Sequence, residues 1–517
     1  MRAPVRNRHG RKGATLLLLM LGLPLVFIPL VGLAIDGTRL YIVQAKLSAA
    51  VDGAALGAGR LLATSANTSE IAGEFLSVNF PAGYWGTTDL TPTINVTNSF
   101  GTHTINVAAT VKTPLLFMRI FGQQNAIVAS NAVATRRNTR VELILDQSGS
   151  MSSTMASMLG GAKQFTGMFT PGTDELGLVA FAGSAIVAYP PYQNTTTWDP
   201  SPTSSTQFGP DSSFATTSTA GPMFTELNLM TSGGGTNTPE SLALAYIELQ
   251  KAHNHAVAGP TGTDDYLNSV VLFTDGQPTA LSTSPNRTSS NALKPFGVSG
   301  GQSPCTYNAN GGTIPDAAHT MAGFIYSDAT GLYLIASTDT TAGHTVDWWL
   351  ANSGWSYLDS SHRHQAIPTV ALAGCAGFGN SLRWNMNDLN QIPAMDLYGN
   401  SVTGYKSISL SDTSSAGGQW ANAVWNATDN VGNTIRNNGV MGSLPAPTGM
   451  LPITIFTIGY TGNGGIDTVL LKRLANTQDS TSYTPTQQVG LFIQVDSASN
   501  LSAAFTQVAS SLLRLAQ

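Results

Sequence analysis

Charged side chains are scarce in this chain of 517 residues: 24 Lys and Arg with 29 Asp and Glu make up 10% of it, against roughly 25% in an average soluble domain. Cysteine is limited to two residues, which excludes a disulfide-built scaffold and a four-cysteine zinc site. The 53 Gly and 26 Pro are too few for a collagen-like or wholly disordered chain. A hydrophobic content of 42% is enough for folded cores.

The basic residues are concentrated at the N-terminus. Five of the 24 lie within the first twelve positions, which contain no acid: Arg2, Arg6, Arg8, Arg11 and Lys12. The remaining residues therefore carry a clear excess of acidic over basic side chains. A body of that sign cannot hold a phosphate backbone by electrostatic attraction, so nucleic-acid binding is disfavoured.

An uncharged, mostly apolar run, residues 14–35, follows the basic cluster. As a helix it would span roughly 33 Å, enough to cross a bilayer, and the basic residues 1–13 would remain cytoplasmic. A cleaved signal peptide is the competing interpretation, but the run exceeds a usual signal core of roughly 7 to 15 residues. Prepilin-type cleavage after Gly13 would need an acid where Leu18 stands. We expect a retained, single-pass transmembrane helix.

Three- and four-residue apolar spacing continues beyond the run and predicts an amphipathic helix over residues 36–61. The residues that carry it are Leu40, Val43, Leu47, Val51, Ala54, Ala58 and Leu61. Its Ala- and Gly-rich face, around residues 49–59, permits close approach to a second helix or packing on its own domain.

The segments GLAIDGTRLY (residues 32–41) and LSAAVDGAAL (residues 47–56) resemble the N-terminal region of TadE/TadG-like proteins of the Flp (Tad) pilus-assembly system. In those proteins a D-x-G-R-L-Y turn follows the apolar helix; here Thr38 replaces the Gly of that turn. The resemblance implies a protein of the bacterial inner membrane with its bulk in the periplasm.

Within residues 62–137, positions 91–135 alternate apolar and polar side chains, as at Ile94, Val96, Ile105 and Val107. Period-two alternation with little charge predicts strands. We expect a small, β-rich α+β linker domain here.

Short apolar runs after Arg140 predict an α/β domain. Strands are expected at Val141–Leu145, Leu176–Phe181, Ser269–Phe273, Ile453–Ile458 and Leu491–Val495, with helices from about Ser152 to Phe169 and from Leu501 to Leu515. Such runs suit a mostly parallel, doubly wound sheet covered by helices on both faces.

Oxygen-bearing side chains occur in three short motifs: Asp146, Ser148 and Ser150 in a D-x-S-x-S motif after the first strand, Thr236 in GGGTNT, and Asp275 in TDG after the strand Ser269–Phe273. A hard divalent cation prefers such ligands. The loops at the carboxyl ends of strands meet at the switch point of an open α/β sheet. The simpler interpretations are a turn Asp before Gly276 and a helix-capping Thr before Pro239.

This pattern resembles the metal-ion-dependent adhesion site of von Willebrand factor type A domains, over residues 139–280 and 414–517. The resemblance implies that Asp146, Ser148, Ser150, Thr236 and Asp275 hold Mg²⁺, or another divalent cation such as Mn²⁺ or Ca²⁺. It also implies a protein partner whose Asp or Glu fills the vacant metal position.

The intervening residues 281–413 are not needed for that fold. They leave the sheet shortly after the expected ligand Asp275, so we expect an insertion beside the metal. They contain Cys305 and Cys375, for which an exported, oxidising compartment predicts a disulfide. Closing that loop would contribute roughly 4 kcal/mol in the chain-entropy model. Two buried free thiols are the alternative.

We find no catalytic signature, and a zinc role for His253 with His255, or His362 with His364, is disfavoured. The expected function is therefore binding: a membrane-anchored extracytoplasmic protein of Flp/Tad pilus assembly or anchoring. A surface adhesin for host or abiotic targets is the main alternative. An accessory to a cytosolic metal chelatase conflicts with the topology, and a purely structural domain with an empty site is the third alternative.

Overall fold

The computed structural model describes residues 10–61, 68–99, 102–183, 185–190, 208–283, 306–307, 312–313, 321–328, 331–338, 383–385, 392–411, 418–441, 445–462 and 465–515. The chain forms two compact units, residues 1–136 and 137–516. Cys305 and Cys375 lie outside the described residues, and so does their predicted disulfide.

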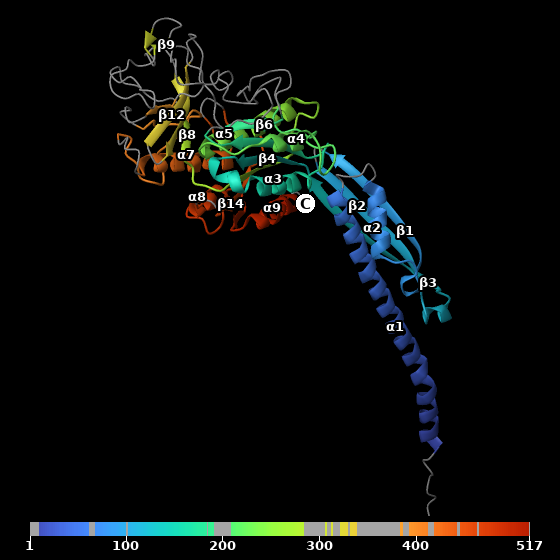
Figure 1. Ribbon diagram of the computed structural model, residues 1–517. Coiled ribbons are helices and arrows are strands. Elements are labelled where there is room, and N and C mark those ends of the chain that lie inside the picture. The colour runs from blue at the N-terminus through green and yellow to red at the C-terminus, as the bar shows by residue number, and fades with distance from the viewer. Residues whose placement is uncertain are drawn as a thin grey trace, which may run out of the picture. The chain divides into compact units, whose positions relative to one another are not determined.

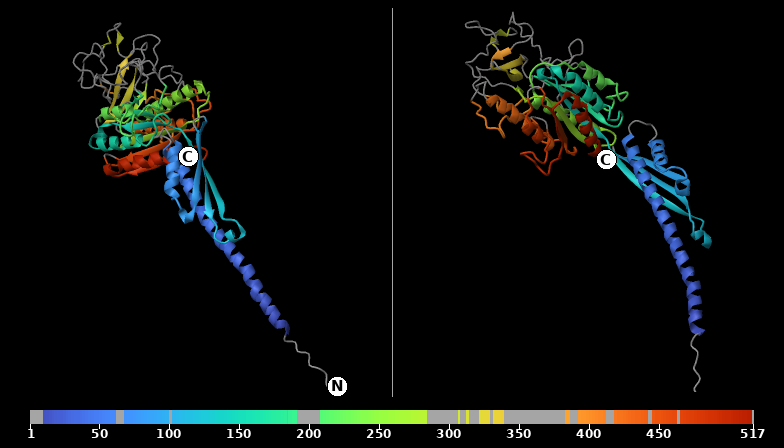
Figure 2. Two further views of the ribbon diagram at one scale, coloured as in Figure 1. Left: turned by 90° about the vertical axis from the view of Figure 1, so that its right-hand side faces the viewer. Right: turned by 60° about the horizontal axis from the view of Figure 1, so that its bottom comes forward.

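Helix α1 (Gly10–Leu61) is one uninterrupted helix, drawn in blue in Figures 1 and 2. The predicted continuation of the apolar helix is confirmed. The segment Asp36–Tyr41, which corresponds to the turn of the TadE/TadG-like proteins, is helical here. The Asp36 carboxylate does not end the helix; it accepts hydrogen bonds from the backbone N–H groups of residues 116–118.

The two halves of α1 have different surroundings. Before Asp36, large apolar side chains are exposed: Met20, Phe27, Ile28, Leu30, Val31, Leu33 and Ile35. After it, one face is buried in the core of the first unit: Val43, Leu47, Ala50, Val51, Ala54, Ala55 and Ala58. The small-residue face thus packs on its own domain. In the described part of the chain, α1 is the one helix long and apolar enough to cross a membrane.

The rest of the first unit is a three-stranded antiparallel sheet with a short helix, α2 (Thr68–Asn79). Strands β1 (Thr88–Ser99), β2 (Thr102–Pro114) and β3 (Asn125–Arg137) lie in the order β1-β2-β3. Buried and exposed residues alternate along β2, as the period-two pattern predicts. Its inward residues, Ile105, Val107, Ala109 and Val111, pack in the same core as α1 and α2.

The second unit is built on a six-stranded sheet in the order β15-β14-β7-β4-β5-β6. Its strands are β4 (Thr139–Asp146), β5 (Glu175–Phe181), β6 (Ala185–Tyr189), β7 (Leu267–Thr274), β14 (Thr454–Tyr460) and β15 (Phe492–Val495). The pairs are parallel except β5 with β6 at one edge. Counted along the chain from β4, the strands run 3-2-1-4-5-6 across the sheet, which is the doubly wound order.

Helices cover both faces of this sheet (Figure 1). Helices α5 (Thr238–Ala258), α7 (Gln419–Arg436) and α8 (Thr468–Leu474) pack on one face. Helices α3 (Met155–Thr166), α4 (Pro222–Leu229) and α9 (Leu501–Leu515) pack on the other. The predicted α/β fold class is confirmed.

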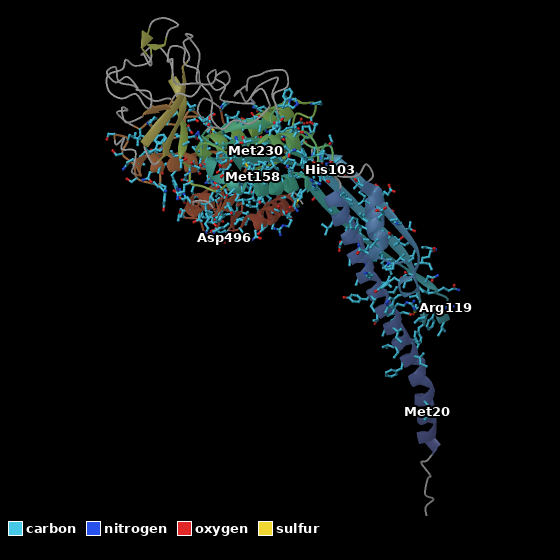
Figure 3. The ribbon with its side chains drawn as sticks, in the orientation of Figure 1. Met20, His103, Arg119, Met158, Met230 and Asp496 are labelled. Atoms are coloured by element: carbon cyan, nitrogen blue, oxygen red, sulfur yellow. The ribbon has the colours of Figure 1, made fainter. Side chains whose placement is uncertain are left out.

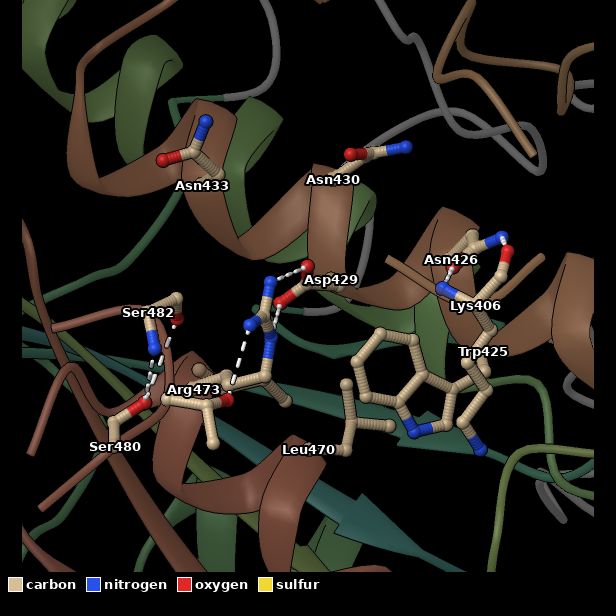
Figure 4. A network of polar contacts seen from close by, with 12 residues as sticks. Lys406, Trp425, Asn426, Asp429, Asn430, Asn433, Leu470, Arg473, Ser480 and Ser482 are labelled. Atoms are coloured by element: carbon tan, nitrogen blue, oxygen red, sulfur yellow. Dashed lines mark hydrogen bonds and ion pairs between the residues drawn. The ribbon is translucent and has the colours of Figure 1, made fainter. Parts of the chain in front are cut away.

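Helices α7 and α8 are joined by a buried ion pair (Figure 4). The Arg473 guanidinium donates from Nε to Asp429 Oδ1 at 2.9 Å and from Nη2 to Asp429 Oδ2 at 2.6 Å. The same guanidinium lies over the Tyr405 ring, 4.4 Å from its centre. Paired bonds of this kind fix both distance and orientation, so α8 is held in register against α7.

Strands outside the main sheet come from the predicted insertion. β8 (Ala280–Thr283), β11 (Met321–Asp328), β12 (Gly331–Thr338) and β13 (Arg383–Asn385) form a sheet in the order β13-β12-β11-β8, and β9 (Thr306–Tyr307) pairs with β10 (Gly312–Thr313). Residues 392–411 return to the α/β unit, where Asn426 of α7 donates to the carbonyls of Val402 and Lys406.

Two adjacent glycines in α3 should respond oppositely to substitution by Ala. A Cβ on Gly161 would lie 2.5 Å from Cδ2 of the buried Phe505 ring of α9, whereas a Cβ on Gly160 meets nothing within 4 Å. We expect Gly161→Ala to destabilise the protein by about 1–3 kcal/mol through overpacking. Gly160→Ala should stabilise it by about 0.5–1 kcal/mol through helix propensity. Urea unfolding measures both, and destabilisation by Gly160→Ala would contradict the packing described.

Candidate metal centre

The candidate site lies at the carboxyl ends of β4 and β7, the two central strands between which the winding of the sheet reverses. Asp146 is the last residue of β4, and Asp275 follows the last residue of β7. Both side chains are fully buried. Ligand sites of doubly wound sheets lie at this switch point, so the topology brings the two carboxylates together.

A chain of hydrogen bonds connects the first loop to Asp275. The Ser148 and Ser150 hydroxyl oxygens lie 2.9 Å apart, and Ser150 Oγ donates to Asp275 Oδ1 at 2.6 Å. The backbone N–H of Ser148 donates to Asp146 Oδ1 at 2.8 Å. Asp275 is therefore bonded across 125 positions rather than serving only as a turn residue before Gly276.

The second loop is fixed to the first through its backbone. Gly233 N–H donates to the Gln147 carbonyl at 2.8 Å, and Gly149 N–H donates to the Gly234 carbonyl at 3.0 Å. A Cβ added to Gly149 would lie 3.4 Å from the Gly234 carbonyl oxygen. That distance is an ordinary contact, whereas Gly234 has a φ of 84°, a backbone conformation that favours glycine.

Thr236 follows these glycines and faces the third loop. Its N–H donates to Thr279 Oγ1 at 3.0 Å, and a Cβ added to Gly276 would lie 3.7 Å from Thr236 Oγ1. The side chain of Asn237, not Thr236, caps α5 by accepting from Glu240 N–H. The first loop is therefore hydrogen-bonded to Asp275, and the Thr236 hydroxyl lies beside Gly276.

The electrostatics of the site are those of two buried carboxylates. Burial, and after it the negative charge of Asp275, raise the pKa of Asp146 to about 7, although hydrogen bonds from Thr274 and Ser148 act to lower it. A bound cation would remove this mutual repulsion.

The donor set suits a hard divalent cation. Two carboxylates and three hydroxyls, those of Ser148, Ser150 and Thr236, supply oxygen only, which Mg²⁺ prefers. Two charged ligands with neutral hydroxyls do not form a closed cage, so water or a ligand from another protein could complete the coordination. Occupancy by a metal and the ligand roles of the five residues remain predictions.

Thr274 belongs to this site and was not among the predicted residues. Its hydroxyl donates to Asp146 Oδ2 at 2.6 Å and so fixes the second oxygen of that carboxylate. The signal was its place at the end of a buried strand, directly before Asp275. A ligand-orienting hydroxyl cannot be separated from a strand-favouring Thr by sequence alone.

The histidines with metal-like spacing have other partners where they are described. His253 is buried, with Nδ1 2.7 Å from Asp264 Oδ2 and Nε2 3.1 Å from the Thr448 carbonyl oxygen. His255 stacks on the Phe208 ring. Within the described residues, no group of three or more His, Cys, Asp or Glu could hold a metal. His362 and His364 lie outside those residues.

A family model described as "Putative Flp pilus-assembly TadE/G-like" matches the N-terminal part of the chain. The matched residues are 13–61. This match confirms the resemblance of that segment, which is α1 almost entire. Comparison with the sequences of curated proteins gives no match.

Solved structures similar to the chain include a pilus adhesin, a von Willebrand factor type A protein and the von Willebrand domain of a pilus tip protein. The adhesin SpaC from Lactobacillus rhamnosus GG is 14% identical, with a TM-score of 0.31 over 83% of this chain and 34% of SpaC. The type A protein from Catenulispora acidiphila is 11% identical, with a TM-score of 0.31 over 82% of this chain and 50% of that protein. The Mfa5 domain from Porphyromonas gingivalis is 15% identical, with a TM-score of 0.31 over 74% of this chain and 98% of that domain. The chain spans about a third of SpaC.

Proposed function

We propose that this protein is a membrane-anchored, extracytoplasmic binding protein of Flp/Tad pilus assembly or anchoring, which binds a protein partner through a divalent-metal-dependent adhesion site. The observation that carries the proposal is the hydrogen-bonded set Asp146, Ser148, Ser150 and Asp275 at the switch point of the sheet. The TadE/G-like segment supports the pilus context. It is a binding protein and not an enzyme.

Each residue of the site has a defined part in this function. Asp146 and Asp275 supply the negative charge that attracts the cation, and Thr274 orients Asp146. Ser148, Ser150 and Thr236 supply neutral oxygens from two loops. When bound, Mg²⁺, Mn²⁺ or Ca²⁺ would supply a vacant coordination position for an Asp or Glu of the partner. Affinity for the partner then depends on the cation.

The proposed topology follows from charge and exposure. The five basic residues before position 13 favour a cytoplasmic N-terminus. The exposed apolar side chains of α1 up to Ile35 need a lipid environment. The α/β unit would then lie in the periplasm, held by one pass through the inner membrane.

Cells that carry Asp275→Asn in this protein should lose pili, because the variant keeps the size of the side chain but removes a charged ligand. Asp479→Asn is the matched control, since Asp479 is an exposed Asp paired with Lys472 on the same unit. Pili counted by electron microscopy measure the effect. Normal piliation in the Asp275→Asn strain would contradict a role in assembly.

A surface adhesin remains the alternative, and the same strain separates the two. If the protein is an adhesin, the Asp275→Asn strain would keep its pili but lose attachment to surfaces. Surface labelling of intact cells would then label the protein. The TadE/G-like segment favours assembly or anchoring in the inner membrane over display on the surface.

A further inference from the structure

An exposed apolar loop joins β2 to β3 in the first unit. This loop, residues 115–121, has the sequence LLFMRIF and contains the short helix η2 (Met118–Phe121). Leu116, Ile120 and Phe121 are 53%, 76% and 65% exposed. Large apolar side chains gathered in one exposed segment mark an interaction site.

The loop is fixed to α1 at a defined height, that is, at a defined position along the helix axis. The backbone N–H groups of Leu116, Phe117 and Met118 donate to the Asp36 carboxylate at 2.8, 3.0 and 2.9 Å. One turn earlier, a Cβ on Gly32 would lie 2.6 Å from the Phe117 side chain. The loop therefore touches α1 at residues 32 and 36, where the exposed apolar half of the helix ends.

That height coincides with the edge of the proposed membrane span. Gly32 precedes the end of the apolar run, Ile35, by about 4.5 Å along the helix axis. Figure 3 shows Arg119 at the end of the sheet, with Met20 further along the exposed half of α1. If α1 crosses a bilayer with residues 14–35, then Phe117 lies just inside its hydrocarbon edge.

A second loop reaches the same height and carries an interfacial residue type. Arg39, less than one turn beyond Asp36, donates from its guanidinium to the Trp85 carbonyl. The Trp85 side chain is 51% exposed. Trp is favoured at the boundary between headgroups and acyl chains. The exposed Arg119 could extend to lipid phosphates while its stem stays in the apolar layer.

We propose that the 115–121 loop and Trp85 insert into the near leaflet of the membrane that α1 crosses. The occupant of this apolar surface is thus the lipid bilayer itself, because the surface continues directly from the exposed span of α1. The first unit would rest on the membrane, with α1 fixed in depth and rotation. This inference rests on the membrane anchoring proposed above.

Photo-crosslinking of the full chain in phosphatidylethanolamine–phosphatidylglycerol vesicles tests the inference. p-Benzoylphenylalanine at Ile120 is the probe, and the same residue at Val78 of α2 is the matched control, since Val78 is an exposed aliphatic residue of the same unit. Asn79, the residue after Val78, lies beside Gly53 of α1. Because Gly53 is about 25 Å beyond Asp36 along the helix axis, Val78 lies about that far from the loop. We expect lipid adducts by mass spectrometry at Ile120 and none above background at Val78.

Failure of the loop inference differs from failure of the anchor. Protein that resists alkaline extraction but forms no lipid adduct at Ile120 would overturn loop insertion and leave the anchor standing. An Ile120 adduct with a second copy of the chain, in place of lipid, would also overturn it. Protein extracted by alkali would contradict the anchor itself, and loop insertion with it.

Discussion

Asp275→Asn is expected to abolish the rise in melting temperature that Mg²⁺ gives the wild-type protein. A cation at about 100 times its dissociation constant stabilises the folded state by about 2.7 kcal/mol. The Asn side chain can still accept the hydrogen bond from Ser150, so the loops keep their connection while one of the two charged ligands is lost.

The same variant should behave differently without metal, which separates loss of the site from loss of the fold. With chelator present, Asp275→Asn should be at least as stable as the wild type, because the charge that raises the pKa of Asp146 is removed. Asp479→Asn should keep the full Mg²⁺ response. Scanning calorimetry with and without Mg²⁺ measures all three, and an unchanged response in Asp275→Asn would show that the site is misassigned.

Glu142→Gln is expected to stabilise the protein increasingly as pH rises. Glu142 lies in β4 with no exposed surface, and within the described residues neither carboxylate oxygen has a hydrogen-bond partner. Burial raises its pKa well above the usual value, and the negative charge of Glu248 adds to the shift against Lys251. The folded state therefore binds a proton that the unfolded chain releases above about pH 4.5.

The sign of this effect follows from linkage. Stability is greatest below the unfolded pKa of Glu142 and falls, by up to about 1.4 kcal/mol per pH unit, as pH rises toward the raised folded pKa. Gln carries no titrating proton, so the difference between variant and wild type should widen upward from about pH 5. Urea unfolding at pH 5, 6, 7 and 8 measures it. Parallel curves would mean that Glu142 ionises as easily in the fold as outside it.

Much of the α/β unit could be predicted because its strands are buried on both faces and so read as short apolar runs. The approach of Ser150 to Asp275 followed as well, since parallel strands place their carboxyl ends at one edge. The order of strands across the sheet decides the pairing, and β4 beside β7 is the order that brings the two loops together.

The missed features depend on partners far away in sequence. The helix through Asp36 was predicted, but the partners of its carboxylate were not, because they are backbone N–H groups about 80 positions away. The spacing of His253 and His255 shows no partner for His253, which is buried and has Asp264 and the Thr448 carbonyl as its polar partners. No local pattern contains such contacts, because they exist only after the chain has folded.

Electron–nuclear double resonance on bound Mn²⁺ tests whether the metal keeps a coordination position for the carboxylate of a partner. The full-length protein is loaded with Mn²⁺ and mixed with a short acidic peptide whose Glu carboxylate is labelled with ¹³C. We expect one bound Mn²⁺ per chain in the wild type, a ¹³C coupling that shows the carboxylate on the metal, and neither signal in Asp275→Asn. Bound Mn²⁺ without a ¹³C coupling, or no bound Mn²⁺ at all, would contradict a metal-dependent adhesion site.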